Sequence, residues 1–371
     1  MSDGEARIVD VATIERELSG LWAEPVGGVA AGAPGMEPAT RACMSNLLVF
    51  CATQEHARRL PEDIATIVEK HPSRVLLLVG EAEHPSGGLA ASVSALCHLT
   101  GGGGQICSEH VTLSAPAAAV KRLPSAARPL LIGDLPTALW WTGSAPPPLA
   151  GELFEDLASM ADHVIYDSAG WPDPVRGVVS VAGWAASVEK GTVVSDLAWR
   201  RGKPWRRLIA QTLDPQVAPG ALEAVEEVVI EHGPHALPQA WFLIGWLAGR
   251  LGWRPVGGKV AAGVEVTWGF RAGERPIGVT VRRLPEGEAE LRSVSVRWKT
   301  ANGRAGAIFD WAGRDRLAVR AEGGATPTRV LSAPREPGAA LVARQLAKLF
   351  HDPLFEDTLA LARQMAEALL R

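Results

Sequence analysis

Net charge, tyrosine and long apolar segments are all scarce in this sequence. The chain of 371 residues carries a formal net charge of −4 at pH 7 and contains a single tyrosine. So small a charge gives no overall field that would attract a nucleic acid. The most apolar segment, 240–249, is half the ~20 residues that a membrane-spanning helix needs, and it is typical of a buried helix. We therefore expect no nucleic acid and no membrane among the partners.

Cysteine is also sparse, and the N-terminus lacks the continuous apolar stretch of a signal peptide. MSDGEARIVDVATIERELSGLW is typical instead of a charged helix, with Ile8, Val11, Ile14 and Leu18 at helical spacing. These features predict a cytoplasmic protein, in which most of the four cysteines stay reduced.

Signature motifs of common catalytic and cofactor sites are missing. The glycines at 101–104 are not followed by the Lys-Ser or Lys-Thr of a phosphate-binding P-loop. No G-x-G-x-x-G follows a predicted strand, and neither G-x-S-x-G nor H-E-x-x-H occurs. We therefore predict no catalytic residues and no cofactor, and we interpret the glycines as a hairpin loop.

Cys97, His98, Cys107 and His110 have the residue types of a zinc site. They fall in two alternating segments, near 91–100 and 106–113, which predict strands on either side of the glycine loop. Alternation places the cysteines on one face and the histidines on the other. Four ligands divided between two faces cannot converge on one ion, so we predict no metal site.

Cys97 and Cys107 do share a face, and a disulfide between them depends on the loop. With a loop of 101–103 they lie directly opposite each other, close enough for a bridge. With a loop of 101–105, Cys97 faces Glu109 and the cysteines are diagonal neighbours, near the outer limit for a bridge. Two buried thiols are the default in the cytosol, so Cys97 and Cys107 are a candidate redox pair only.

Buried strands alternate with a helix at the start of the segment 41–233. SNLLVF and SRVLLLVG are apolar on both faces, as in strands covered by helices, and a helix at about 55–70 separates them. This β-α-β order predicts a parallel pair. RPLLIGDLPTALWW and HVIYDS supply further buried strands. We expect an α/β domain with a mixed, partly parallel sheet, preceded by the N-terminal helix and a flexible linker within 1–40.

The segment 234–371 has a different character. A buried helix at 238–251 ends before Gly252, a natural helix terminator. Two helices close the chain, the second with Asp352 as N-cap. Between them lie alternating segments that predict an antiparallel meander with one wet face: VEVTWGF, PIGVTVRR, ELRSVSVRW, GAIFDW and RLAVRA. We expect an α+β C-terminal domain.

DLAWRRGKPWRRLIAQTLDP, at 196–215, crowds two tryptophans, four arginines and a lysine together. A helix from Pro204 places Trp205 on an apolar face, and Arg206 and Arg207 away from it. Arginines in a first turn oppose the helix dipole, so an anion must offset them. That anion is an acid of the same chain, such as Asp196, or a group on a partner. The pattern favours an intramolecular anchor, with a partner-facing basic edge as the alternative.

Eight segments, in order, resemble the glucose-6-phosphate dehydrogenase assembly protein OpcA family. They are MSNLLVF, HPSRVLLL, ICSEHVTL, LPSAARPLLIGDLPTALWW, ADHVIYDSAGW, the basic segment 196–215, QAWFLIGWLAGRLGW and HDPLFEDTLALARQM. HPSR, DLP..LWW and DL.W....PWR are specific when they occur together in this order. The similarity extends over most of the chain.

The resemblance implies a non-enzymatic accessory protein that binds glucose-6-phosphate dehydrogenase. It would promote the active oligomer or raise activity allosterically in the oxidative pentose phosphate pathway, by binding the active state more tightly. Tryptophan and arginine dominate interface energetics. The candidate partner-binding residues are Trp140, Trp141, Arg200, Arg201, Lys203 and Arg206. Glutamates in place of Arg200 and Arg201 are then expected to weaken binding and leave the fold intact.

The alternative is an enzyme or sensor that binds a phosphorylated sugar or nucleotide through the arginines of 200–207. An enzyme of this kind needs a general acid or base beside those arginines in a concave pocket. His71, His110 and Asp134 are the candidates for that role. A third interpretation, a single-strand nucleic-acid binder, needs a continuous basic groove that the net charge disfavours.

Overall fold

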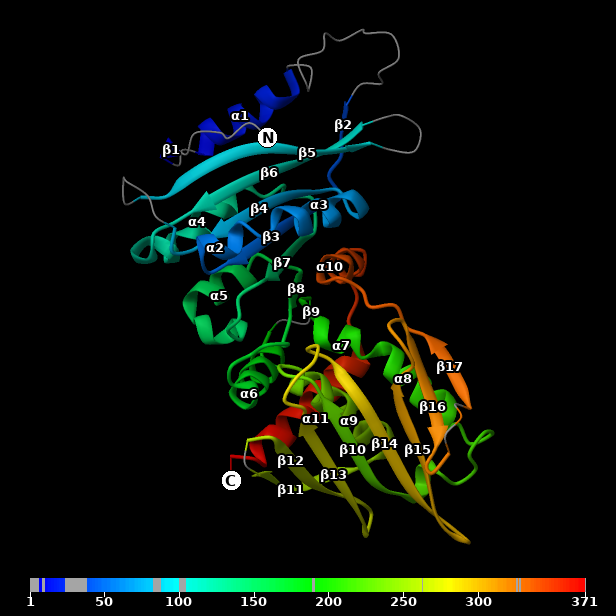
Figure 1. The fold of residues 1–371 in the computed structure, drawn as a ribbon. Coiled ribbons are helices and arrows are strands. Elements are labelled where there is room, and N and C mark those ends of the chain that lie inside the picture. Colours follow the sequence, from blue (N-terminus) through cyan, green and yellow to red (C-terminus); the bar gives the residue numbers. More distant parts are fainter. Residues whose placement is uncertain are drawn as a thin grey trace.

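The structure is a computed structural model, and it describes residues 7–8, 11–23, 39–82, 88–99, 105–188, 191–261, 263–324, 326 and 328–370. Two sheets with their helices make up these parts of the chain, and Figure 1 shows one above the other. The predicted fold class is confirmed, because a mostly parallel α/β unit is followed by an α+β unit.

The first sheet has nine strands within the described ranges. They are β1 (Arg7–Ile8), β2 (Ala39–Arg41), β3 (Ser45–Cys51), β4 (Ser73–Val79), β5 (Ala90–Leu99), β6 (Gln105–Ser114), β7 (Thr137–Trp141), β8 (His163–Tyr166) and β9 (Val193–Asp196). Their order is β1-β5-β6-β4-β3-β7-β8-β9, with β2 beside β6. The run from β6 to β9 is parallel throughout, while β5 is antiparallel to both neighbours. The parallel strands therefore have the 3-2-1-4-5-6 order of the Rossmann fold.

The Rossmann strand order occurs here without the glycine fingerprint. β3 is followed by Ala52 and Thr53, and the Thr53 hydroxyl accepts a hydrogen bond from the backbone N of His56 at 3.2 Å. This bond caps α2 (Gln54–Ala57), a helix of four residues. At Gly80, just after β4, an added Cβ would lie 2.8 Å from the carbonyl oxygen of Ala52. The first β-α turn is thus held by the Thr53 cap, and the backbone at Gly80, just after β4, packs closely against it.

Helices cover both faces of the first sheet, which explains why every position of β3 and β4 is buried. One face packs against α1 (Val11–Ala23), α4 (Leu123–Ala127), α5 (Glu152–Ala158) and α6 (Pro174–Ala185). The other face packs against α3 (Pro61–Lys70) and α10 (Gly338–Leu346). α10 comes from near the end of the sequence, so residues far apart along the chain build one core.

Two details of the first unit differ from the sequence-based expectations. Ile8 lies in β1 and pairs with Ala90 of β5, so the helix begins at Val11. The helix expected at 55–70 is two helices, α2 and α3, because Pro61 begins a new one. The predicted linker at 24–40 lies outside the described residues except at its last two positions, which belong to β2.

The second sheet has eight strands within the described ranges and contains the predicted meander. The strands are β10 (Val225–His232), β11 (Arg254–Ala261), β12 (Glu265–Ala272), β13 (Arg275–Arg283), β14 (Leu291–Thr300), β15 (Gly303–Trp311), β16 (Arg316–Ala321) and β17 (Arg329–Ser332). β10 lies between β13 and β14, parallel to the first and antiparallel to the second. β10 precedes position 234, where the second unit was expected to begin, yet its hydrogen bonds place it in the second sheet.

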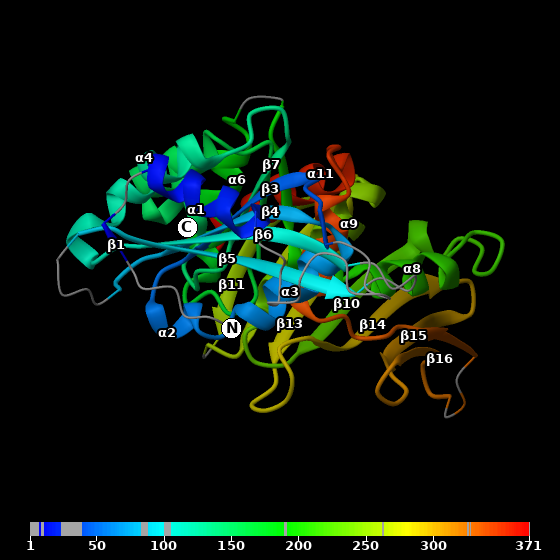
Figure 2. The same cartoon turned by 90° about the horizontal axis from the view of Figure 1, so that it is seen from above.

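Two long helices pack on the apolar face of the second sheet. α9 (Leu237–Leu251) ends at Gly252, which has φ 66°, as the sequence predicts. α11 (Pro353–Glu367) starts after the expected cap, Asp352. Trp268 of β12 meets the ring of Trp241 edge to face, and its Nε1 donates to the carbonyl of Met365 at 3.0 Å. In Figure 2, α11 lies beside α9 and α6, and so connects the two units.

No helix in the described parts of the chain is long and apolar enough to cross a membrane. The shorter helical segments of the molecule are α7 (Leu197–Arg201), α8 (Lys203–Thr212) and the 3-10 turns Ala117–Arg122, Arg128–Leu130, Pro147–Ala150 and Leu222–Ala224. α7 and α8 follow β9 directly and contain most of the predicted partner-binding residues.

Candidate functional site

Trp140 and Trp141 lie in β7, the strand next to β3 at the centre of the first sheet. Their side chains are 6% and 3% exposed, because β7 is covered on both faces. Trp141 stacks on Phe50, with the ring centroids 4.3 Å apart. Trp140 points to the opposite face, where α3 and α10 pack. Burial of this kind removes both tryptophans from the candidate partner surface.

Arg200, at the end of α7, binds an acid of its own chain. Its guanidinium is 3.1 Å from Oδ2 of Asp352, and this oxygen also accepts from Nε1 of Trp199 at 3.0 Å. Both partners of the ion pair are about one-fifth exposed. The other carboxylate oxygen of Asp352 accepts from the backbone N of Phe355 and caps α11. Arg200 therefore joins the first unit to the last helix.

Arg201 forms a bidentate pair with Asp167, which follows β8. Its two terminal nitrogens lie 2.8 and 2.7 Å from the two carboxylate oxygens. Asp196, the fully buried N-cap of α7, lies near this pair. Burial, with a contribution from the charge of Asp167, raises the pKa of Asp196 to about 7. The carboxyl ends of β8 and β9 thus hold a buried polar cluster.

Arg206 is held against Trp199. The guanidinium carbon lies 3.3 Å from the centroid of the Trp199 ring, a cation–π contact, and a terminal nitrogen donates to the Trp199 carbonyl at 2.8 Å. Burial lowers the pKa of Arg206 to about 9. Trp205 is 2% exposed and packs with Leu208 and Ile209, so the predicted apolar face of α8 is confirmed.

Three of the four predicted basic residues, Arg200, Arg201 and Arg206, thus make intramolecular contacts, as the favoured interpretation of the sequence expected. Asp167, Asp352 and the Trp199 ring supply the compensating groups, whereas the Asp196 carboxylate accepts from the backbone N of Ala198 in α7. Lys203 is exposed, and so is Arg207 beside it in α8.

A cavity of about 880 Å³ opens next to α7 and α8. Its other walls come from α9, the loop before β14, the end of β17 and α10. Eight basic side chains line it: Arg200, Arg201, Lys203, Arg206, Arg207, Arg335, Arg344 and Lys348. Four carboxylates line it as well: Glu288, Glu290, Glu336 and Asp352. The cavity is thus strongly basic in a chain that is slightly acidic overall.

The far side of this cavity was missed from the sequence. Arg335, Arg344 and Lys348 lie more than a hundred positions after α8, and only the return of α10 to the first sheet brings them to the basic segment. One local signal was present. Arg344 and Lys348 are four residues apart, the spacing of one helix face, although α10 ends at Leu346 and Lys348 lies just beyond it.

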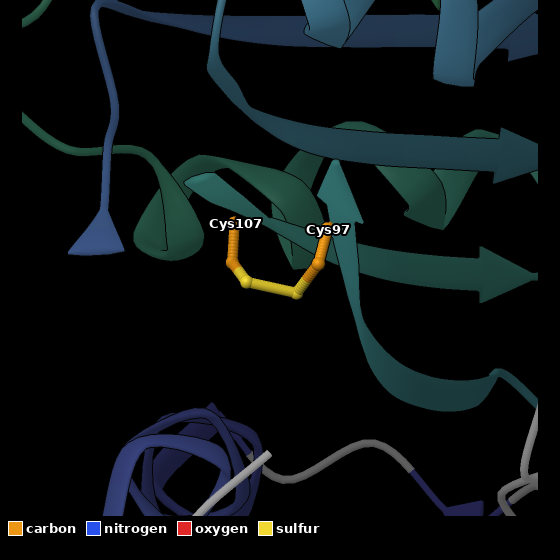
Figure 3. Close-up of a disulfide and its surroundings, with 2 residues drawn as sticks. All are labelled: Cys97 and Cys107. Atoms are coloured by element: carbon orange, nitrogen blue, oxygen red, sulfur yellow. A yellow bond between two sulfur atoms is a disulfide. The ribbon is translucent and has the colours of Figure 1, made fainter. Parts of the chain in front are cut away.

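Cys97 and Cys107 are joined by a disulfide between β5 and β6, shown in Figure 3. The two residues are direct cross-strand partners, the arrangement that the shorter of the two loops predicts. The default of two free thiols is therefore wrong for this pair, while Cys43 and Cys51 are free. His98 and His110 pair with Ile106 and Ser94, at positions of opposite orientation to the cysteines. The described residues contain no group of three or more His, Cys, Asp or Glu side chains arranged to hold a metal.

Two family models match this chain. Residues 65–183 match the glucose-6-phosphate dehydrogenase subunit N-terminal domain, and residues 192–359 match the C-terminal domain of the same subunit. The chain belongs to the OpcA family. The boundary between the two matched segments falls just before β9, whereas the strands of the second sheet begin with β10.

Curated relatives include three cyanobacterial proteins named OxPP cycle protein OpcA. The protein of Nostoc punctiforme is 36% identical over 203 residues, which is 53% of this chain and 41% of the relative. That of Synechocystis is 28% identical over 311 residues, 80% of this chain and 64% of the relative. The alignments thus span between two-fifths and two-thirds of the length of these two OpcA proteins.

Solved structures with a similar fold include the transcriptional regulator Gal80p of Kluyveromyces lactis. It has a TM-score of 0.51 at 8% identity and covers 90% of this chain and 93% of its own. A Gal80p variant from Saccharomyces cerevisiae has a TM-score of 0.50 at 9% identity, with 89% and 95% covered. At these identities the similarity concerns the fold alone.

Proposed function

We propose that this OpcA-family chain is a non-enzymatic accessory protein that binds glucose-6-phosphate dehydrogenase and promotes its assembly or activation. The observation that carries the proposal is the match of two successive segments, 65–183 and 192–359, to the N- and C-terminal domains of a glucose-6-phosphate dehydrogenase subunit. The relatives named OxPP cycle proteins support a place in the oxidative pentose phosphate pathway. An accessory protein of this kind acts by binding the active form of its enzyme more tightly than the inactive form.

Of the partner-binding candidates, Lys203 is the exposed one, and the structure adds neighbours to it. Lys348 lies near Lys203, and the positive charge of Lys203 helps to lower the pKa of Lys348. The next two residues, Leu349 and Phe350, are 50% and 65% exposed. Apolar side chains with a charged rim are typical of protein interfaces. We call Lys203, Lys348, Leu349 and Phe350 the 348–350 edge and propose it as the docking surface for the dehydrogenase.

The first experiment measures the activity of the same organism's glucose-6-phosphate dehydrogenase with and without this protein, together with light scattering of the mixture. We expect higher activity and a larger species. If neither the activity nor the particle size changes, the proposal fails and the family similarity concerns the fold only.

Replacing Leu349 and Phe350 with serine tests the docking surface. Since large exposed apolar anchors carry much of an interface's affinity, we expect the double variant to bind the dehydrogenase ~10-fold more weakly or worse. The matched control places serines at Val256 and Val260 of β11, which are 62% and 50% exposed. Equal affinities of the two double variants would exclude the 348–350 edge.

An enzyme acting through the arginines of 200–207 receives less support. His71, His110 and Asp134, the acid–base candidates, are absent from the residues that line the basic cavity. His71 follows α3, His110 lies within β6, and Asp134 is exposed before β7. The carboxylates that do line the cavity include Asp352, Glu290 and Glu336, which are paired with Arg200, Arg335 and Arg344.

A further inference from the structure

The basic cavity contains more positive charge than its own acids neutralise. Arg200, Arg335 and Arg344 are paired with cavity carboxylates, and Arg201 is paired with Asp167 outside it. Arg206 is stacked on Trp199. Lys203, Arg207 and Lys348 remain, and their side chains make no ion pair or hydrogen bond to the described part of the chain. Three basic groups therefore border the cavity without an ion-pair partner among the described residues.

The pKa of Lys348 shows the effect of these crowded positive charges. Partial burial and the nearby charges of Arg200, Lys203 and Arg344 lower the pKa of its ammonium group, with Asp352 opposing them. Cations gathered around one space repel each other, and an anion placed among them relieves the repulsion. Lysine and arginine side chains are the usual ligands of phosphate groups.

Buried polar atoms in the cavity wall also lack partners. Gln345 is 2% exposed, and its amide oxygen has no hydrogen-bond partner among the described residues. Nε of Arg200 is likewise buried and unpaired within the described ranges. Because most buried polar atoms in proteins have partners, these two atoms offer one free acceptor and one free donor at the cavity wall to a bound ligand. A hydroxyl group is both, since its oxygen accepts and its hydrogen donates.

Apolar surface completes the site. Trp246 and Trp311 line the cavity and are partly exposed. Aromatic rings provide large flat contacts, and pockets of about 300–1,000 Å³ suit small ligands, so a cavity of about 880 Å³ is in range. A phosphate alone would leave these walls and the unpaired amide of Gln345 unused.

We propose that this cavity binds a phosphorylated small metabolite that carries hydroxyl groups, with its phosphate at Lys203, Arg207 and Lys348. The hydroxyl-bearing part lies against Gln345 and the tryptophans. The phosphate monoester is the recognised chemistry, and a sugar phosphate and a nucleotide monophosphate are its two sources. Binding to the isolated protein does not depend on the proposed interaction with glucose-6-phosphate dehydrogenase.

Calorimetric titration of the full chain alone tests the proposal, with tryptophan fluorescence as a second readout. The probes are glucose 6-phosphate, adenosine 5′-monophosphate, inorganic phosphate and unphosphorylated glucose. We expect saturable binding of at least one of the two esters, tighter than inorganic phosphate, and no binding of glucose. Tighter binding of glucose 6-phosphate identifies a sugar site, and tighter binding of adenosine 5′-monophosphate identifies a nucleotide site.

Two variants test whether the ester binds in the cavity. Lys203→Gln with Lys348→Gln removes two charges without ion-pair partners in the described part of the chain, one at an exposed and one at a half-buried position. We expect affinity for the ester to fall about tenfold for each ammonium lost. Gln345→Leu should weaken the ester and leave inorganic phosphate unchanged. Lys299→Gln, at an exposed position of β14 outside the cavity, is the control. Circular dichroism verifies the fold of each variant.

Three results would overturn the proposal. One is the absence of saturable binding for both esters. Another is equal affinity for an ester and for inorganic phosphate. The third is an ester affinity that the double lysine variant leaves unchanged while its fold is intact. None of these outcomes bears on assembly with the dehydrogenase, which the activity and light-scattering experiment tests separately.

Discussion

Arg200 and Asp352 are 152 positions apart in the sequence and form a partly buried ion pair, 3.1 Å long, between the first unit and the last helix. The same carboxylate caps α11 and accepts a hydrogen bond from the Trp199 indole. One aspartate thus has three roles: it pairs a charge, satisfies an indole N–H and begins a helix. Changes at this position should affect the packing of both units.

Asp352→Ala is expected to lower the free energy of unfolding by roughly 2–4 kcal/mol, from a lost cap of about 1 kcal/mol and an unpaired, partly buried arginine. Asp352→Asn keeps one acceptor oxygen and should lose about half as much. Urea denaturation measures both. Asp357→Ala, at an exposed position of the same helix, is the control. If the alanine variants at 352 and 357 were equally stable, the connection between the units would not depend on Asp352.

Replacing Arg200 and Arg201 with glutamate was expected from the sequence to leave the fold intact. The structure corrects this, because the new carboxylates would face Asp352 and Asp167. Breaking a partly buried pair costs about 2 kcal/mol or more, and like charges add to that loss. We expect the double variant to be several kcal/mol less stable in urea. The same charge change at Lys203 and Arg207, which are exposed, should leave stability nearly unchanged. Similar urea midpoints for the two double variants would contradict this prediction.

Asp196 predicts a pH dependence of stability. Its folded pKa of about 7 lies above the usual 3.8 of an aspartate carboxyl. Between these values the folded state holds a proton that the unfolded state has released, so stability decreases as the pH rises through this window. Asp196→Asn keeps the cap acceptor and cannot ionise. It should gain stability relative to the parent as the pH rises from 4 to 8, by a few kcal/mol at about 1.4 per pKa unit.

The stability difference between Asp196→Asn and the parent, measured at several pH values, isolates this effect. Burial lowers the pKa values of His110 and His163 to about 4, so these histidines remove stability as the pH falls below their usual 6.5. Their contribution cancels in the difference because both proteins contain them. A difference that does not vary with pH would show that Asp196 ionises as it does in the unfolded chain.

The disulfide between Cys97 and Cys107 should stabilise the hairpin of β5 and β6. The cysteines are ten positions apart, and closing a loop of that length contributes about 2–3 kcal/mol through the unfolded state. Reduction should therefore lower the urea midpoint of the parent and leave Cys97→Ala/Cys107→Ala unchanged. The same shift in both proteins would mean that reductant acts elsewhere. The role of this bond as a redox switch stays a prediction.

Local pattern was enough to predict most strands, the end of α9 at Gly252 and the cap of α11 at Asp352, because these depend on neighbouring residues. The inward face of α8 also followed from spacing alone. The interpretation of Trp140 and Trp141 as partner-binding residues conflicted with the buried strand that the sequence predicts at the same positions. A strand covered on both faces buries every side chain.

Long-range arrangement could not be predicted from local pattern. The insertion of β10 between β13 and β14 and the return of α10 to the first sheet join segments separated by long stretches of sequence. The acids that pair with Arg200 and Arg201 come from α11 and from the end of β8 for the same reason. Three of the eight basic side chains of the cavity come from the distant segment 335–348, so only its α7–α8 wall was visible in the sequence.

Because α10 packs on the first sheet, it also sets the order in which parts of the protein can fold during synthesis. Domains generally fold as they leave the ribosome, N-terminal part first. Here the face of the first sheet that holds Trp140 receives Leu341 and Val342 only when the last part of the chain has been translated. Until then the nascent first unit exposes an apolar surface, so this chain cannot finish its first half before its second half has been made.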